Sequence, residues 1–324
     1  MLNILVDGPV SAAASAAPEP VRLKAAELKA LAQRSNGPAT RQALVHLGAI
    51  ALTAALLWQA LGTLWALPLT VLLGYLQAFL VTSLHECAHQ TAFRSRAGNT
   101  LLGHLSGLAI LLPYGYYRAF HWDHHRYTQD PERDPELSTP LPSGGWHLLW
   151  YFSGLPTWRD RIRLRLMHGV LGRVTAPWVA AEKRPLIVRE ARCYLAFYAL
   201  VATVSVATHS MAAVWLWTVP MMVGQIFLRP YLLAEHTGCG HSRDMLENTR
   251  TTFTHAFVHR FAWNMPHHAE HHAYPAVPFH ALPRLHALLA GHIVHTAPSY
   301  RAATATVVRS LADRSAEARP GATA

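Results

Sequence analysis

The hydrophobic pattern of the chain predicts a first membrane hairpin close to the N-terminus. Residues 44–65 are almost free of charge, and a second apolar run covers residues 67–84 after a turn marked by Gly62 and Pro68. Each run approaches the ~20 residues that a helix needs to cross a bilayer. Two antiparallel transmembrane helices are therefore expected here.

A second pair of apolar runs covers residues 193–208 and 212–234, and Pro220 and Pro230 are expected to distort its second helix. Between the two pairs, residues 101–112 are also apolar, but this run is too short to cross a bilayer and favours an interfacial or re-entrant helix. The pattern therefore predicts an all-α integral membrane protein with four transmembrane helices in two hairpins.

The polar flanks of this membrane domain, which we place at residues 43–292, are expected to be tails. Residues 1–42 are rich in Ala, Ser and Pro and lack the pattern of a signal peptide. Within them, residues 21–34 alternate Leu with Lys and Arg, which fits either an amphipathic helix at the membrane surface or a solvated helix. Residues 293–324 are the predicted C-terminal tail.

The charges indicate how these elements face the membrane. Only 14% of the residues are charged, against about 25% in soluble domains, and the formal net charge is +10. Lys and Arg are absent from the turns at 62–68 and 208–212, so the positive-inside rule places both termini and the middle segment in the cytoplasm, with a bacterial inner membrane as the expected location. No nucleic-acid-binding motif accompanies the positive charge, so no nucleic-acid partner is expected.

Histidine is the unusual residue of the composition, because 22 histidines outnumber the 18 Asp and Glu residues together. Imidazole is the commonest metal ligand among side chains. The three cysteines, Cys87, Cys193 and Cys239, form no CxxC pair and therefore indicate neither a zinc knuckle nor a redox dithiol.

Eight histidines fall into three boxes on the side of the membrane predicted to be cytoplasmic. In the first box, His85-Glu-Cys-Ala-His89, the two imidazoles share one helical face. The other two boxes have the spacing HxxHH, which places three imidazoles within about one turn. They are formed by His121, His124 and His125, and by His268, His271 and His272. Eight imidazoles exceed the ligands of one zinc site and suit iron among other first-row metals, so two metal ions are expected.

These boxes resemble those of the membrane fatty acid desaturase and hydroxylase superfamily, which has HxxxH, HxxHH and HxxHH boxes on the cytoplasmic side of four transmembrane helices. The resemblance covers roughly residues 44–290, and the stretch from Asn264 to His286 is similar to the bacterial branch in detail. It implies a cytoplasmic helical cap that carries the boxes and a non-haem centre of two iron ions that activates oxygen. By the same resemblance a further histidine follows the fourth helix, and His236 is favoured over His241 as that ligand.

The resemblance implies an oxygen-dependent lipid desaturase that removes hydrogen from an unactivated methylene of a fatty acyl chain, with no separate catalytic side chain assigned. A lipid or carotenoid hydroxylase or ketolase with the same boxes is the alternative. The chain has no haem-binding His-Pro-Gly-Gly motif and no cysteine array for an iron–sulfur cluster, so electrons are expected from a separate ferredoxin or cytochrome b5-like protein. A cationic strip could dock this donor or bind anionic headgroups; it consists of Arg159, Arg161, Arg163 and Arg165 beside Trp150 and Trp158.

Several polar residues near the boxes have two possible roles. Asp123, Glu235 and Glu270 could accept the second ring N–H of ligand histidines or be surface carboxylates. A salt-linked lid or a headgroup contact could form just after the second box, from Asp130, Arg133 and Asp134. His267 lies one residue outside the third box and is expected outside the ligand set. Surface or packing roles are expected for His241, His255, His259, His280 and His286.

Two other classes of protein were weighed. Residues 85–89 are also a literal HExxH motif of zinc proteases, but an intramembrane protease needs an aspartate in a later apolar segment, whereas Asp244 and Asp313 lie in polar sequence. A transporter would need metal-binding residues along its spans, where only isolated candidates such as His46 occur. A substrate tunnel could be lined by aromatic residues for which helix packing is the alternative, namely Trp58, Tyr75, Phe79 and Trp217.

Overall fold

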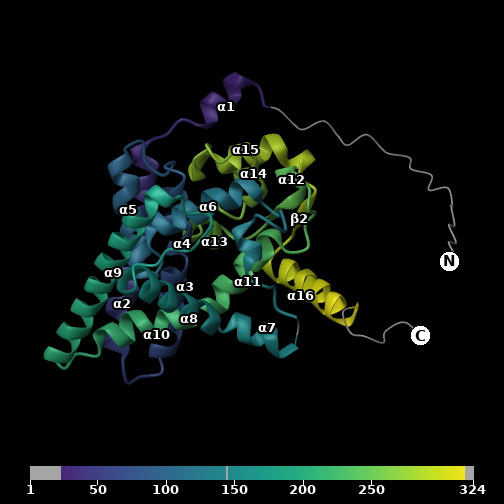
Figure 1. Cartoon of the computed structure of the whole chain (residues 1–324). Coiled ribbons are helices and arrows are strands. Elements are labelled where there is room, and N and C mark those ends of the chain that lie inside the picture. The colour runs from purple at the N-terminus through teal and green to yellow at the C-terminus, as the bar shows by residue number, and fades with distance from the viewer. Residues whose placement is uncertain (1–22, 144, 318–324) are drawn as a thin grey trace, which may run out of the picture.

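The computed structural model describes residues 23–143 and 145–317, which form a mostly helical molecule (Figure 1). Three helices in this part of the chain are long and apolar enough to cross a membrane. They are α2 (Asn36–Ala60), the consecutive helices α3 (Ala66–Ala78) and α4 (Leu80–Ala88), and α9 (Arg184–Ala207), which continues the turn η3 (Ala181–Lys183). They correspond to the predicted spans at 44–65, 67–84 and 193–208.

The fourth predicted span is helical but broken. Residues 212–234 contain a π-helical turn, η4 (Val214–Thr218), then α10 (Val219–Val223) and α11 (Gln225–His236), with Gly224 between the last two. Pro220 lies in the first turn of α10, where its missing N–H costs nothing, whereas Pro230 lies inside α11. Of the two prolines expected to distort this helix, Pro220 lies beside the break, whereas α11 continues through Pro230. The segment is not one of the three continuous helices of spanning length in the described chain.

The remaining helices lie between and after these spans. Those before α9 are α1 (Ala25–Leu31), α5 (Arg96–Ala109), α6 (Tyr114–Tyr127), η1 (Pro135–Ser138), α7 (Gly145–Phe152), α8 (Leu155–Arg165) and the π turn η2 (Leu166–Val170). Those after α11 are α12 (Met245–Asn248), α13 (Ala256–Phe261), α14 (His268–Ala273), η5 (Phe279–Ala281), α15 (Leu282–Leu289), η6 (Ala290–His292) and α16 (Tyr300–Glu317). In Figure 1, α6, α14 and α15 gather at one end of the long helices.

Two short strands depart from the all-α expectation. β1 (Arg250–Thr252) pairs in parallel with β2 (His295–Ala297), with Thr251 opposite Thr296. Arg250 donates to the backbone carbonyls of Ala234 and Thr237, so β1 is attached to the C-terminal end of α11. The segment predicted as a C-terminal tail thus contributes β2 and α16 in its described part, and α16 packs against α11 through Leu233, Val307 and Leu311.

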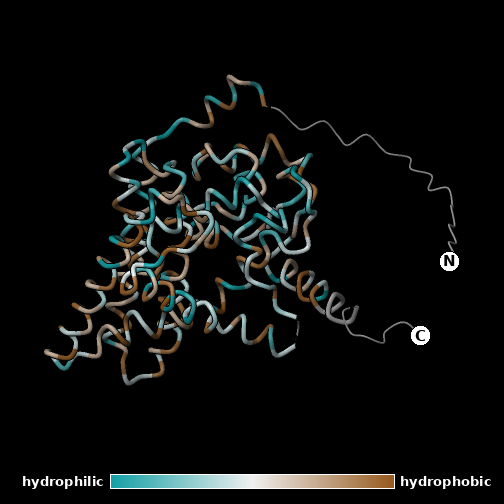
Figure 2. The backbone as a smooth tube through the Cα atoms, viewed as in Figure 1, coloured by the Kyte–Doolittle hydropathy of each residue, from teal (hydrophilic) through white to brown (hydrophobic). Residues whose placement is uncertain are grey.

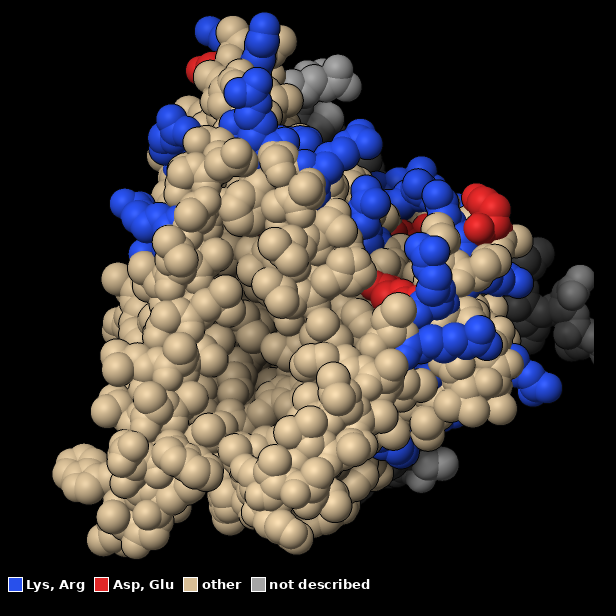
Figure 3. All heavy atoms as spheres, turned by 90° about the vertical axis from the view of Figure 1, so that its left-hand side faces the viewer, with Lys and Arg blue, Asp and Glu red and all other residues tan. Residues whose placement is uncertain are grey.

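The outer surface of the long helices is apolar. Large side chains there are exposed, among them Leu52, Leu200 and Val206 at 62%, 60% and 75%. Hydrophobic residues follow these helices in Figure 2, and Figure 3 shows a broad face without charged side chains, bordered at one end by Lys and Arg. An apolar belt of this extent with a basic margin is the surface expected of a multi-pass membrane protein.

The short helix α5 ends inside the apolar half of the molecule, and this corrects the predicted cationic strip. Arg161 and Arg165, four residues apart on α8, are buried and donate to the carbonyls of Ile110 and Leu111 just after α5. A helix that stops there leaves carbonyls that water cannot reach, and cationic donors satisfy them. The strip of four exposed arginines is therefore wrong, because only Arg159 and Arg163 are exposed.

Close packing of two glycines joins the two predicted hairpins. Gly74 on α3 and Gly224 at the start of α11 face each other, and a Cβ atom on Gly74 would lie 2.3 Å from the carbonyl oxygen of Pro220. A Cβ on Gly224 would lie 2.1 Å from the carbonyl oxygen of Gly74. Small residues allow helix backbones to approach this closely in membrane proteins.

Replacing Gly74 by Ala should destabilise the protein by about 1–3 kcal/mol, because the added methyl group meets backbone that cannot move aside cheaply. The thermal midpoint of unfolding in mild detergent should fall. Gly48→Ala on α2 is the matched control, since nothing lies within 4 Å of its Cβ position. Equal midpoints for Gly74→Ala, the control and the wild type would contradict the close approach of α3 and α10.

Candidate metal centre

The nine predicted ligand histidines converge from four helices onto one buried place. The first box forms the end of α4, the second the last turns of α6, and the third α14, while His236 is the last residue of α11. Their ring nitrogens form two groups. The first contains His85, His89, His121, His125 and His271, and the second contains His124, His236 and His272 with His268 beside them.

In the first group, the ring nitrogens face one another at short distances. His89 Nε2 lies 2.7 Å from His121 Nε2 and 3.1 Å from His271 Nε2, and His125 Nε2 lies 3.0 Å from His121 Nε2. The ring of His85 packs 4.2 Å from that of His121, centroid to centroid, and both of its nitrogens are buried without a hydrogen-bond partner among the described residues. Five imidazoles thus surround one small volume.

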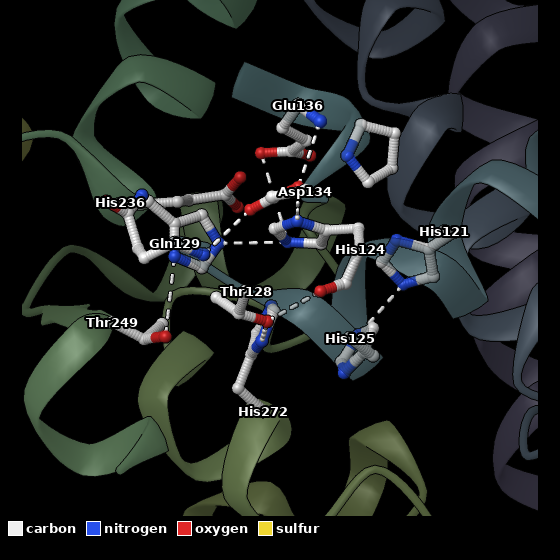
Figure 4. A network of polar contacts seen from close by, with 12 residues as sticks. His121, His124, His125, Thr128, Gln129, Asp134, Glu136, His236, Thr249 and His272 are labelled. Carbon is white, nitrogen blue, oxygen red and sulfur yellow. Dashed lines mark hydrogen bonds and ion pairs between the residues drawn. The ribbon is translucent and has the colours of Figure 1, made fainter. Parts of the chain in front are cut away.

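The second group is oriented by carboxylates on one side, which Figure 4 shows. His124 Nδ1 donates to Asp134 Oδ1 over 2.9 Å, and the side chain of Asp134 also accepts from the backbone N–H groups of Gln129 and Glu136. This orients the ring so that His124 Nε2 is directed at His236 Nε2, 3.3 Å away. The second carboxylate, Glu136, lies 3.9 Å from the same His124 Nε2.

The other members of the second group repeat this arrangement. His236 Nδ1 donates to the carbonyl of Asn248 over 3.3 Å, and His272 Nδ1 lies 3.2 Å from Thr128 Oγ1. The hydroxyl of Thr128 donates to the carbonyl of His124, so it accepts from His272. His268 Nδ1 lies 3.5 Å from Glu235 Oε1, and its Nε2 lies 3.2 Å from His236 Nε2. His124, His236 and His272 therefore have the outward nitrogen hydrogen-bonded, as metal-ligating histidines usually do, whereas His268 Nδ1 only approaches Glu235.

Each HxxHH box divides between the two groups. On α6, His121 and His125 belong to the first group and His124 to the second; on α14, His268 and His272 belong to the second and His271 to the first. Residues four apart share a helical face, whereas adjacent residues point about 100° apart. The sequence predicted the three imidazoles of each box together; helix geometry separates them.

Burial keeps most of these imidazoles in the form that binds metals. Desolvation lowers the pKa well below the usual histidine value for His121, His125, His271 and His272. Burial also acts to lower the pKa of His124, but Glu136 and Asp134 outweigh it and raise that pKa above its ordinary value. Neutral imidazole is the ligand form of histidine, so the first group is ready to bind cations without losing protons.

The spacing of the nitrogens fits metal binding. Two ligands at right angles on an ion, each about 2.1 Å from it, are about 3.0 Å apart. The Nε2 separations of 2.7–3.3 Å in the two groups lie around this value. Buried rings such as His85, whose nitrogens find no partner in the described chain, are costly unless a further group satisfies them. The donor set therefore fits two first-row metal ions.

The acidic residues divide differently from the expectation. Glu235 lies beside His268, whereas Asp123 pairs with Arg126 on the surface of α6, 3.5 Å away, and Glu270 contacts His267 and His286 instead of a box histidine. Asp134, which the sequence suggested as part of a lid, is the carboxylate that orients His124. In the sequence, Asp134 stands nine residues after the second box and just before a Pro. There it is the N-cap residue of η1.

His236 and His241, the two candidates for the ninth ligand, lie in different places. His236 lies in the second group, whereas His241 donates from Nδ1 to the carbonyl of Gln129 outside it. His46, the isolated histidine of the first span, is bonded to the carbonyl of Leu76 and to Trp263 Nε1. It links helices and contacts neither group.

The HExxH glutamate turns away from the candidate metals. Glu86 is fully buried, and its Oε1 accepts the backbone N–H of Phe279 over 3.1 Å. A zinc protease needs this carboxylate beside the metal-bound water, where it acts as a general base. The direction of Glu86 therefore speaks against the protease.

A small cavity of about 30 Å³ opens beside both groups. Its walls include His121, His124 and His268 together with the carboxylates of Glu136 and Glu235 and the side chains of Tyr117 and Tyr231. Of the aromatics suggested for a tunnel, Tyr75 and Phe79 are buried and stacked on each other, 4.5 Å between centroids, and Phe79 packs edge-on against Tyr231. Trp217 donates to the carbonyl of Ala109, and Trp58 is 46% exposed.

With this geometry established, comparison with known proteins is informative. The family model described as fatty acid desaturase matches residues 62–304, which include all three boxes and His236. The chain belongs to the fatty acid desaturase family. The match begins after α2, before the second apolar helix, and ends in α16, so it covers the later membrane helices and the histidine groups but not the first membrane helix.

Curated relatives match over shorter stretches. The chain is 34% identical over 103 residues to the sn-1 oleoyl-lipid 12-desaturase of Picosynechococcus sp. (strain ATCC 27264 / PCC 7002 / PR-6). This aligned stretch covers 30% of this chain and 28% of that protein. It is 37% identical over 83 residues to the dihydrorhizobitoxine desaturase of Bradyrhizobium elkanii, 25% of this chain and 24% of the relative. A stretch of 50 residues is 40% identical to the sn-1 acyl-lipid omega-3 desaturase (ferredoxin) of Nostoc sp. (strain 36), 15% of this chain and 14% of that one. The aligned stretches thus span less than a third of each relative.

Replacing Asp134 by Asn should lower the affinity of the second group for a divalent metal by about 10–100-fold, because partners that orient a ligand histidine have effects of that size. The amide has one acceptor oxygen where the carboxylate serves His124 and two backbone N–H groups. Metal affinity can be measured by competition with a chromophoric chelator. Asp130→Asn is the control, because that carboxylate accepts from Glu132 N–H. An unchanged affinity in Asp134→Asn would refute the orienting role.

Proposed function

We propose that this chain is an oxygen-dependent membrane desaturase of fatty acyl lipids, and that the nine histidines of the two groups bind two iron ions. The observation that carries the proposal is the convergence of nine buried imidazoles into groups of five and four at the end of apolar helices. The family match and the desaturase names of the relatives support the reaction class. In this proposal His85, His89, His121, His125 and His271 hold one ion, and His124, His236, His268 and His272 hold the other.

When bound, the two irons would supply oxygen activation and the oxidation of an unactivated C–H bond. The chain's own residues orient the ligands and keep water away. Asp134, Thr128 and the carbonyl of Asn248 fix the rings of the second group, and Trp122 packs against His89 at 5.1 Å between centroids. The cavity lined by Glu136 and Glu235 is the place where a methylene of the substrate would meet the oxidant.

The surface supports a lipid substrate and a cytoplasmic site. Exposed apolar side chains cover the long helices, and Lys and Arg border this apolar face at one end (Figure 3). By the positive-inside rule this end is cytoplasmic, and the box helices form a cap there. An acyl chain could reach the cap from the bilayer without crossing water.

Electrons must come from outside the two groups, and we propose a separate reduced protein as the donor. One relative is named as a ferredoxin-dependent acyl-lipid desaturase, which favours a ferredoxin. The exposed Arg159 and Arg163 remain available for an acidic partner, whereas Arg161 and Arg165 serve the end of α5. Hydroxylation by the same site is the second candidate, because hydrogen abstraction is common to both reactions.

The metal assignment is tested first on protein purified without oxygen in mild detergent. Elemental analysis should find two irons per chain in the wild type, and His124→Ala and His271→Ala should each lose iron. A protein that binds zinc and no iron under iron-replete expression would overturn the proposal. His292→Ala, an exposed histidine of η6, is the control and should keep the wild-type content.

The reaction is tested by expressing the same variants in a bacterium and analysing its lipids by mass spectrometry. The wild type should introduce a double bond into fatty acyl chains, the His292→Ala control should do the same, and His124→Ala and His271→Ala should abolish the product because each removes a ligand. Hydroxylated products would favour the second candidate. Full activity in either ligand variant would refute the assignment.

A further inference from the structure

A third group of metal-binding side chains lies outside the nine histidines. His267, Glu270 and His286 place ligand atoms within 4.8 Å of one another. His267 Nδ1 lies 3.4 Å from Glu270 Oε1, and His286 Nδ1 contacts the same oxygen. We propose that these three residues bind a divalent metal of the zinc class, which fastens α14 to α15.

The placement of the group on α14 makes it separate from the other two. Glu270 follows His268 by two residues and precedes His272 by two, which puts it about 200° around the helix from each of them. The imidazole of His286 comes from α15, and Thr251 of β1 donates its hydroxyl to Glu270. An ion here would connect α14 to α15 beside β1, on the side of α14 opposite His268 and His272 and about 100° from His271.

The charge of Glu270 favours a cation. Its side chain is fully buried, and its ion pairs among the described residues are with the two imidazoles alone. A buried carboxylate is costly unless a positive charge accompanies it. His267 is 8% exposed, and its Nδ1 makes no hydrogen bond within the described chain although it is directed at Glu270. One divalent ion would satisfy both the carboxylate and this nitrogen.

The donor set suits zinc. Two imidazoles and one carboxylate are a common zinc ligand set that leaves a fourth position open. The ring of His259 packs 4.9 Å from that of His267, centroid to centroid. His286 is partly exposed, so an ion can enter from the surface. The sequence placed His267 outside the ligand set of the third box, and this group gives it a role.

The test counts metal ions in the full chain after removal of any affinity tag. Protein stripped with a chelator is equilibrated with zinc, desalted and analysed for bound zinc per chain. The wild type and His292→Ala should bind three equivalents, and His286→Ala should bind two. His124→Ala should lose zinc only from the box groups, so that the double variant His124→Ala/His286→Ala loses one equivalent more than His124→Ala.

These counts separate the third site from the proposed function. If the box groups bind no metal, the equivalent lost in His286→Ala still identifies the third site. Equal zinc content in His286→Ala and the wild type overturns the proposal and leaves Glu270 with its contacts to Thr251, His267 and His286 alone. If His286→Ala fails to fold, His267→Ala replaces it. The site is also refuted if all the zinc bound by the wild type is lost when the box histidines are replaced.

Discussion

The structure depends on the burial of nine imidazole rings whose nitrogens face one another. Buried imidazole rings whose nitrogens face one another are unfavourable in an apolar interior unless the surrounding structure fixes the position of each ring. The helices α4, α6, α11 and α14 supply that constraint. The glycine contact between α3 and the start of α11, the attachment of β1 to α11, and the arginines that satisfy α5 all serve to keep these helix ends in register.

The two groups are supported in different ways. In the second group three rings donate from their outer nitrogens to Asp134, Asn248 and Thr128, and His268 Nδ1 lies 3.5 Å from Glu235 without a hydrogen bond among the described residues. In the first group the outer nitrogens of His89, His125 and His271 are buried without hydrogen bonds among the described residues, and ring packing orients them. A metal bound in the second group would therefore have more basic ligands. The two positions are chemically unequal before any substrate arrives.

Much of this centre could be predicted from the sequence, because box spacing is a local property of a helix. His236 lies in the second group and His241 does not, since His236 ends α11, the last helix of the second predicted hairpin. The partners of the rings could not be found this way. Asp134 reaches His124 through a turn, and Arg161 reaches Ile110 across the fold, so both depend on tertiary contacts that periodicity does not encode. The broken fourth span shows the same limit, because proline indicates a distortion without specifying where the helix resumes.

Because each HxxHH box divides between the two groups, the geometry of the helix determines how far apart the groups lie. His124 and His125 are neighbours in sequence yet serve different groups, as do His271 and His272. The separation of the two groups is consequently set by the pitch and radius of an α-helix rather than by a bridging side chain. An insertion or deletion between these histidines would rotate the ligands that follow it away from their groups. The number of residues between the histidines of α6 and of α14 is thus the feature that this chain is least free to change.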